Sequence, residues 1–392
     1  IGDNILIQDA QLEQGLAATS VITTGAVPAQ AGILENTPRL DYSGGATCPS
    51  LLLEPSRSNL VVTSEYAGGS GWFISSGYSV SQNVAISPEG VQNAFELTIP
   101  STNGNARAIV SVSPSKEYTF SFYVKRGTAT ELKYSIFNLT NNSNIIAQTS
   151  YYSQTSATEW KRIEVTFTTP AGCTSAGVYI DRDSQADGTA FFYGAQCEAG
   201  SYATSYIPTY GTSQTRAEDL TYKTNVTSLI GQTEGTMYVE FEFNTNNTDN
   251  FNRIFSLGDG TGSNRILIMA QNTEVFRFFV QSGGTISVDL ITSTSVFGGK
   301  HKAAFGYKEN DFVAYVDGVQ VGADTSGIVP ITSNVYLGMH ESTNNLALEG
   351  LVQEALLFKT RLSNLDLAIL TGATTYETFD EMALALNYTV YE

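Results

Sequence analysis

Between residues 61 and 216, hydrophobic and polar residues alternate in short segments that are separated by polar turns. The clearest alternation occurs in two segments, one beginning at Glu117 and the other at Trp160. The large side chains on one face are Tyr118, Phe120, Phe122 and Val124 in the first segment and Ile163, Val165 and Phe167 in the second. Strict alternation is typical of β-strands. Strands at this spacing, with no helical segment between them, predict an antiparallel sandwich.

Residues 217–392 continue the strand pattern as a second module. Asp317-Gly318 separates two strand-like runs, and Asp-Gly supplies the positive φ angles of a type I′ hairpin turn. Two capping boxes follow, each before a short apolar segment. The paired residues are Ser363 with Asp366 and Thr378 with Glu381. The predicted fold class is therefore all-β: tandem antiparallel β-sandwiches (jelly rolls), with two short C-terminal helices that cover one end of the second sandwich.

Residues 10–24 (AQLEQGLAATSVITT) repeat residues 195–209 (AQCEAGSYATSYIPT) in register and without a gap. Because the second copy ends the first module, the repeat predicts that residues 1–24 are the terminal strand of an upstream module. Repetition of this kind is typical of arrays of small folded units. Two interpretations are open: the chain is an excerpt of a longer tandem-module protein, or this strand pairs with another chain. Residues 25–60, which hold four prolines, are predicted to be a strap or linker.

The charge balance narrows the classes of partner. The net charge is −18. This disfavours nucleic acid, whose phosphates are neutralised by Lys and Arg, and anionic membrane surfaces. No apolar run approaches the roughly 18 residues of a membrane span, so we expect no membrane insertion. A neutral glycan, a protein partner or a cation remains compatible, and so does an acidity that only keeps the protein soluble.

The number and spacing of the cysteines predict no disulfide framework. Cys48, Cys173 and Cys197 are odd in number and widely spaced, which fits neither a disulfide scaffold nor a zinc site. We expect buried or half-buried free thiols in a protein assembled in a reducing cytoplasm.

Aromatic rings are the main candidate binding groups, because glycan-binding domains present rings to the apolar face of a sugar. Trp72 lies between Gly71 and Phe73 in a Ser/Gly-rich segment, which favours exposure, whereas Trp160 begins an alternating strand and is predicted to be in the core. The candidate glycan-binding residues are Trp72, Tyr78, Tyr134, Tyr151 and Tyr152. The candidates for an end site in the second module are Phe251, Arg253 and residues 339–346. The alternative is that most of these side chains are core or scattered surface residues.

Two loops are candidates for a structural calcium ion. Asp181 and Asp183 lie in DRDSQADG, and Asp259 lies in GDGTGSN. Calcium needs six to eight oxygen ligands, and neither loop supplies a full set by itself. The alternative interpretation is ordinary Asp/Gly turns.

Catalytic patterns are weak, and we expect no enzyme. The two histidines, His301 and His340, have no nucleophile-elbow motif to act with. Glu240 and Glu242 alternate on one strand, about 7 Å apart, which a glycoside hydrolase allows. The preferred interpretation is that they face solvent opposite buried Tyr238, Phe241 and Phe243.

Residues 235–372 resemble the laminin-G-like, concanavalin-A-type jelly roll. The residues that carry this resemblance are Gly235-Thr236, the hairpin DFVAYVDGVQVG, the strand NVYLGMH and the closing stretch LEGLVQEALLFKTRLSNLDLAIL. Residues 56–216 are similar to carbohydrate-binding-module sandwiches. The stretches that match are SNLVVTSEYAGGSGWF, EYTFSFYVKRG, WKRIEVTFTTPAG and FFYGAQCEAGSYATSYIPT. Together they resemble tail fibres and other virion proteins of tailed bacteriophages.

This resemblance implies a non-enzymatic phage virion protein, a tail fibre or receptor-binding component that contacts host-surface glycans. The expected partners are host glycan and other virion proteins, in a homotrimer by analogy with fibres, assembled in the host cytoplasm. Two alternatives stay open: a capsid decoration or head-fibre protein, and a polysaccharide depolymerase. Fold alone does not decide between them.

Overall fold

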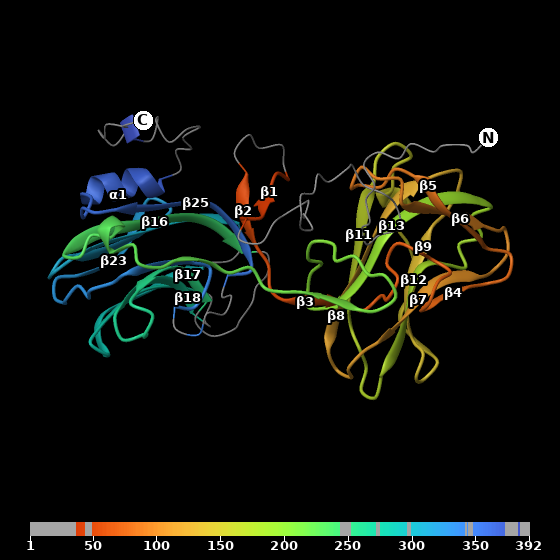
Figure 1. Ribbon diagram of the computed structural model, residues 1–392, viewed down its shortest axis with the longest axis horizontal. Helices are drawn as coiled ribbons and strands as arrows, with labels where there is room; N and C mark the ends of the chain where they lie inside the picture. Colours follow the sequence, from red (N-terminus) through yellow and green to blue (C-terminus); the bar gives the residue numbers. More distant parts are fainter. Residues whose placement is uncertain are drawn as a thin grey trace, which may run out of the picture. The chain divides into compact units, whose positions relative to one another are not determined.

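The computed structural model describes residues 37–43, 49–243, 252–271, 275–295, 299–341, 343, 348–372 and 383–384. The chain divides into two compact units (Figure 1). The described part of the first unit is residues 56–217. The described part of the second unit is discontinuous, with residues 37–55 preceding the first unit in sequence and the remainder following from residue 218.

The first unit is a sandwich of two five-stranded antiparallel sheets, which we call sheets I and II. The strands of sheet I are, in order across it, β10 (Ser143–Ser150), β9 (Lys133–Asn138), β12 (Ser175–Arg182), β7 (Asn105–Ser111) and β4 (Trp72–Ile74). The strands of sheet II are β11 (Lys161–Thr168), β8 (Glu117–Arg126), β13 (Gly188–Ala199), β6 (Ala94–Ile99) and β5 (Ser79–Ala85). The smaller elements are the strand pair β3 (Arg57–Asn59) and β14 (Gln214–Arg216) and the 3₁₀ turn η1 (Tyr152–Gln154).

Aromatic side chains fill the space between sheets I and II. The Phe122 ring lies 5.2 Å from Phe120 and 6.0 Å from Phe192, and it meets Tyr151 edge-on at 5.5 Å. These are ordinary distances for favourable aromatic pairs. The predicted alternation of β8 and β11 is confirmed, since their large apolar residues belong to this core.

The second unit is also a sandwich, built from a seven-stranded sheet III and a six-stranded sheet IV. The strands of sheet III are β1 (Leu40–Asp41), β2 (Ser50–Leu53), β25 (Gly350–Phe358), β16 (Glu234–Phe243), β21 (Lys300–Lys308), β22 (Phe312–Val316) and β23 (Val319–Asp324). The strands of sheet IV are β15 (Thr221–Lys223), β24 (Asn334–Leu337), β17 (Asn252–Gly258), β18 (Arg265–Gln271), β19 (Val275–Ser282) and β20 (Thr285–Ser295). A 3₁₀ turn, η2 (Thr227–Leu229), precedes β16. The predicted all-β sandwich fold is confirmed.

Local sequence signals explain two features of the second unit. Asp317 (φ 48°) and Gly318 (φ 83°) form the predicted turn between β22 and β23. The helix α1 (Asn364–Thr371) begins at Ser363, whose hydroxyl accepts a hydrogen bond from the Asp366 amide in the predicted capping box. The predicted helix after Thr378 lies outside the described residues. No helix in the described ranges has the length and apolarity that crossing a membrane requires.

Helix α1 covers part of the outer face of sheet III (Figure 1). Its Leu367 and Leu370 pack with Tyr238 of β16, which is 1% exposed. The expectation that Tyr238 lies opposite Glu240 is wrong, because alternation places both on the same face. Tyr238 is buried because the helix covers it, whereas Met237, Val239 and Phe241 point into the core between the sheets.

The chain leaves the second unit after Pro55 and re-enters it at Glu218, and residues next to these two positions are hydrogen-bonded to each other. Strand β3 pairs with β14, with Arg57 opposite Arg216. Within the second unit, the Asp219 amide donates to the Glu54 carbonyl at 3.0 Å. Arg39 joins the Glu54 and Asp219 carboxylates at 2.6 Å each. Residues 50–53, from the predicted strap, are strand β2 of sheet III.

The sequence motif at residues 195–209 folds as a buried hydrogen-bonded unit, which we call the exit clasp. Asn59 is fully buried, and its side-chain amide donates to the carbonyls of Ala195 and Ile207 and accepts from the amides of Val61 and Cys197, all within 3.1 Å. The other side chains of the clasp bond one another or the backbone. Gln196 accepts from the Ile207 amide at 2.7 Å, and Glu198 accepts from the Thr204 amide and hydroxyl at 2.8 and 2.7 Å. Among the residues common to both copies of the repeat, Gln196, Glu198 and Thr204 thus use their side chains to satisfy buried polar groups. The first copy, with the rest of residues 1–24, lies outside the described residues.

Cys173 and Cys197 are buried and free. Burial raises the pKa of both thiols. Cys48 lies outside the described residues.

Candidate functional site

The outer face of sheet I carries aromatic rings and guanidinium groups in alternation, which we call the aromatic–arginine ladder. Its members are Phe73, Arg107, Tyr179, Arg182 and Phe137. The Arg107 guanidinium carbon lies 4.3 Å from the centre of the Phe73 ring and 5.3 Å from that of Tyr179. The Arg182 guanidinium lies 5.0 Å from the Tyr179 ring and 4.7 Å from Phe137. Each cation therefore lies within the range of a favourable cation–π contact with two rings.

Strand register explains why these residues share a face. Phe73 of β4 is opposite Arg107 of β7, and Arg107 is opposite Tyr179 of β12. A register shift between Tyr179 and Asp181 then adds one residue to β12. Because a bulge changes which side chains point outward, Arg182 returns to the face of the ladder, opposite Asn105, while Asp181 points inward.

The ring of Tyr179 lies next to Gly177 on the same strand. It is only 2% exposed, although it is not part of the core between the sheets, because Arg107 and Arg182 cover it. Gly177 leaves room for this arrangement: a Cβ atom there would lie 2.9 Å from Tyr179 Cε2 and 3.1 Å from Arg107 Cδ. A glycine in a strand interior is often found where another group approaches the backbone closely.

Hydrogen bonds fix both arginines. Arg107 Nη1 donates to the Tyr179 hydroxyl at 2.8 Å. Arg182 Nη1 donates to Ser135 Oγ at 3.1 Å and Asn144 Oδ1 at 2.8 Å. The ladder is therefore held in one arrangement, which reduces the entropy lost when a ligand binds.

Part of the ladder is open to solvent. Phe73 is 44% exposed, and Ile109, beside it on β7, is 40% exposed. Asn144 and other polar side chains of β10 border the face. Exposed rings that are flanked by amides and hydroxyls can bind a polyhydroxylated ligand through its apolar face and its hydroxyls.

The predicted glycan-binding residues lie on the other side of sheet I or inside the unit. Tyr78 is 7% exposed and Tyr151 is fully buried. Trp72, Tyr134 and Tyr152 are partly buried and pack against the core. The expected exposure of Trp72 in a loop is wrong: the residue begins β4, its Nε1 donates to the Thr63 carbonyl at 2.8 Å, and its ring meets Phe95 edge-on at 6.1 Å.

The expectation for the second tryptophan is also wrong. Trp160 is half-buried and is not part of the core, its Nε1 donates to the Ile86 carbonyl at 3.0 Å, and the Lys125 ammonium lies 5.3 Å from its ring. The ladder residues were absent from the sequence-based candidates. The sequence signal that could have identified Phe73 is the alternation in WFI, residues 72–74. Because successive side chains of a strand point to opposite faces, Phe73 points outward if Trp72 points inward.

The three predicted metal-binding carboxylates lie in separate hydrogen-bonded settings. Asp181 is buried and accepts from Tyr78 Oη at 2.7 Å and Ser184 Oγ at 2.9 Å. Asp183 accepts from the Gly104 amide at 3.1 Å and Gln148 at 3.0 Å. Asp259 accepts from Thr261 and Asn264 within its own turn. Within the described ranges, no three His, Cys, Asp or Glu residues are grouped as a metal site. A structural calcium stays a prediction.

The outer face of sheet IV contains a second charged cluster. Glu341 is 1% exposed; its carboxylate is 3.1 Å from Arg253 Nε and also pairs with Arg265. Burial would raise the pKa of Glu341, but the two arginines hold it below its ordinary value. His340 contacts Arg253, and burial lowers its pKa. Arg253 and part of the predicted 339–346 loop therefore meet here, whereas Phe251 lies outside the described residues.

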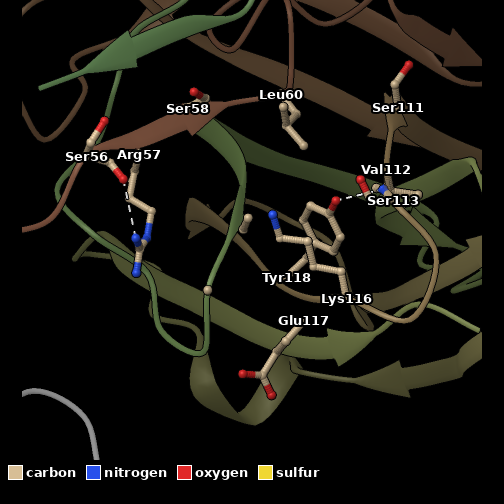
Figure 2. A pocket seen from close by; sticks show the side chains of 12 residues that line it. Ser56, Arg57, Ser58, Leu60, Ser111, Val112, Ser113, Lys116, Glu117 and Tyr118 are labelled. Atoms are coloured by element: carbon tan, nitrogen blue, oxygen red, sulfur yellow. Dashed lines mark hydrogen bonds between the residues drawn. The ribbon is translucent and has the colours of Figure 1, made fainter. Parts of the chain in front are cut away.

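A pocket of about 770 Å³ lies at one end of the first unit, and Figure 2 shows the side chains that line it. Arg57 of β3 lies on one side, and Tyr118 and Lys116 lie on the other. Tyr118 accepts a hydrogen bond from the Ser113 amide at 2.8 Å. None of the predicted glycan-binding or metal-binding residues lines this pocket.

The groups considered for catalysis have structural contacts. Glu240 lies 3.9 Å from the Lys302 ammonium and opposite Glu354 on the neighbouring strand. His301 Nδ1 is 2.7 Å from Asp317 Oδ2, and its ring packs against Phe241 and Phe276.

Comparison with known families supports two carbohydrate-related domains. Residues 59–185 match a family described as a carbohydrate binding domain. Residues 217–368 match the concanavalin A-like lectin/glucanases superfamily. The first match contains all five residues of the ladder. Carbohydrate binding is therefore supported, and domains of these two kinds suggest a non-catalytic role.

Two curated relatives match over 121 residues, which is 29% of this chain. They are the tRNA3(Ser)-specific nuclease WapA of Bacillus spizizenii, at 30% identity, and the tRNA nuclease WapA of Bacillus subtilis (strain 168), at 29%. The match spans only 5% of the length of either relative.

Solved structures with partial similarity include the Ruminococcus gnavus IT-sialidase CBM40 bound to alpha2,3 sialyllactose. It has 16% identity and a TM-score of 0.33, over 38% of this chain and 86% of that one. A heptameric SAP-like pentraxin from Limulus polyphemus has 10% identity and a TM-score of 0.29, over 34% and 68% of the two chains. Scores this low carry no argument about the ligand of this chain.

Proposed function

We propose that this protein is a non-enzymatic glycan-binding protein and that the aromatic–arginine ladder is its binding face. The observation that carries the proposal is the exposed Phe73 ring beside the fixed guanidinium group of Arg107, within the segment that matches a carbohydrate binding domain. A sugar ring stacked on Phe73 would find hydrogen-bonding groups in Arg107, and a longer glycan laid across the strands would extend to Arg182 and Asn144.

We further propose that the chain serves a tailed bacteriophage as a tail fibre or receptor-binding component that contacts host-surface glycans. The combination of a carbohydrate-binding unit and a concanavalin-A-like unit supports this proposal by resemblance. Such a protein would be assembled in the host cytoplasm as a homotrimer. Its weak sites would act together, because linked sites gain avidity without any new contact.

A glycan array probed with the full chain tests the binding face. We expect Phe73→Ala to weaken binding about fivefold, since the ring contributes about 1 kcal/mol by stacking. Tyr42→Ala, which removes a 60% exposed ring from the second unit, serves as the matched control. Equal binding by the wild type and Phe73→Ala would contradict the proposed face.

The alternatives predict other results. A capsid decoration or head-fibre protein would bind particles firmly and bind no glycan. A depolymerase would release reducing sugar from a bound polysaccharide, and Glu240→Gln would abolish that release.

A further inference from the structure

We propose that the aromatic–arginine ladder selects glycans that carry a carboxylate, such as uronic or sialic acid units, over neutral glycans. This inference rests on the proposed glycan-binding function. It concerns the charge of the ligand, which the stacking of sugar on Phe73 leaves open.

The first argument is the unusual state of Arg107. Most arginines in the described part of the chain lie within 4.0 Å of a carboxylate. Those with such partners are Arg39, Arg57, Arg162, Arg182, Arg253, Arg265, Arg277 and Arg361. Arg107 instead contacts Phe73, Tyr179 and Asn105, and no carboxylate of the described residues pairs with it. Arg107 is therefore a positive charge on the proposed binding face that no carboxylate of the described residues offsets, on a chain with a net charge of −18. Arg126 of sheet II shares this state but lies outside the ladder.

The second argument is the weak pairing of Arg182. Its Nε is 3.8 Å from Asp183, beyond hydrogen-bond distance. The same carboxylate already accepts from the Gly104 amide and from Gln148. Asp183 therefore offsets the charge of Arg182 only in part, and the ladder keeps a net positive charge.

The third argument is the orientation of the guanidinium groups. The N–H groups of a guanidinium lie in its plane, so Arg107 donates from its edge, and its Nε is buried. Its Nη1 is occupied by Tyr179 and Asn105. Within the described residues, its Nη2 donates to no protein group. A sugar stacked on Phe73 would place a ring substituent near this edge, and a carboxylate there would form a charge-assisted hydrogen bond, which is stronger than one to a neutral hydroxyl.

The test uses one glycan array printed in duplicate, with the carboxylates of the second copy converted to methyl esters. We expect the full chain to bind acidic glycans on the untreated copy and to bind their esters about ten- to a hundredfold more weakly. Arg107→Gln should lose this difference. Arg126→Gln should keep it, because Arg126 is also stacked on one ring, that of Tyr152 at 4.6 Å, but lies in sheet II outside the ladder.

The outcomes of this experiment distinguish failure of the acidic-glycan preference from failure of the proposed function. Equal binding to both copies, or an unchanged preference in Arg107→Gln, overturns the selection of acidic glycans and leaves the proposed function intact. Binding to neither copy overturns the proposed function itself. The thermal unfolding midpoint of each variant confirms that it is folded, and Arg182→Gln provides a second ladder variant.

Discussion

At the scale of single residues, the first unit depends on buried polar side chains as well as on its aromatic core. Asn59 makes four hydrogen bonds in a fully buried position, and Glu198 and Gln196 complete the exit clasp. A buried polar group without partners costs more than its bonds contribute when satisfied. These residues therefore tolerate little change, although none of them contacts the candidate site.

The first prediction concerns Asn59. Asn59→Ala leaves two carbonyls and two amides of the backbone without partners, so we expect the free energy of unfolding of the first unit to fall by about 2–4 kcal/mol. Denaturant unfolding measures this change. Asn141→Ala, at an exposed position of the same unit, should change it by less than about 0.5 kcal/mol. A similar small effect at both positions would contradict the role of the clasp.

The second prediction concerns Asp181. Burial raises the pKa of its carboxyl to about 6 from 3.8, although hydrogen bonds from Tyr78 and Ser184 oppose the rise. Between these two values the folded state holds a proton that the unfolded state has released, so this group stabilises the first unit below about pH 4, and its contribution is lost as the pH rises through 6. The full effect is about 3 kcal/mol.

Asp181→Asn removes this titration. The free energy of unfolding of the wild type, minus that of the variant, should therefore decrease as the pH is raised from 4 to 7. A difference that stays constant over this interval would show that the carboxyl titrates at its ordinary pKa.

At the scale of elements, the sequence predicted strands well wherever a local pattern settles them. Alternation of hydrophobic and polar residues correctly predicted β8 and β11. Asp317-Gly318 correctly predicted a turn, and the pair Ser363 and Asp366 correctly predicted the start of α1. The site was not predicted. A single register shift after Tyr179 turns Arg182 outward, and pairing among β4, β7 and β12 brings Phe73, Arg107 and Tyr179 into one row. Neither the register shift nor the strand pairing can be read from a short stretch of sequence, because neighbours on adjacent strands are distant in sequence.

The third prediction separates the two faces of α1. Leu367 is fully buried against sheet III, whereas Leu365, two residues earlier, is 69% exposed. Leu367→Ala should lower the free energy of unfolding of the second unit by about 2–4 kcal/mol, through lost burial and a residual cavity. Leu365→Ala should lower it by less than about 0.5 kcal/mol. Equal losses in the two variants would mean that the helix does not pack through Leu367.

At the scale of the whole molecule, each unit has its own core. The cluster around Phe122 is confined to the first unit, and the clusters around Phe241 and Leu367 are confined to the second. Large chains of this kind generally unfold in more than one step.

The fourth prediction follows from these separate cores. Calorimetry of the full chain should resolve two unfolding transitions. Asn59→Ala should lower the midpoint of one of them and Leu367→Ala the midpoint of the other. A single transition that both variants shift would contradict independent units.

The pairing of β3 with β14, together with the bond between the Asp219 amide and the Glu54 carbonyl, has a consequence for how such proteins diversify. The chain departs from the second unit and returns to it at neighbouring residues. The stretch from Ser56 to Ala217 can therefore be exchanged as one piece. A different sandwich grafted between Pro55 and Glu218 would leave the ion pairs of Arg39 with Glu54 and Asp219 in place. Recombination at this junction would exchange the first unit and leave the second unit unchanged.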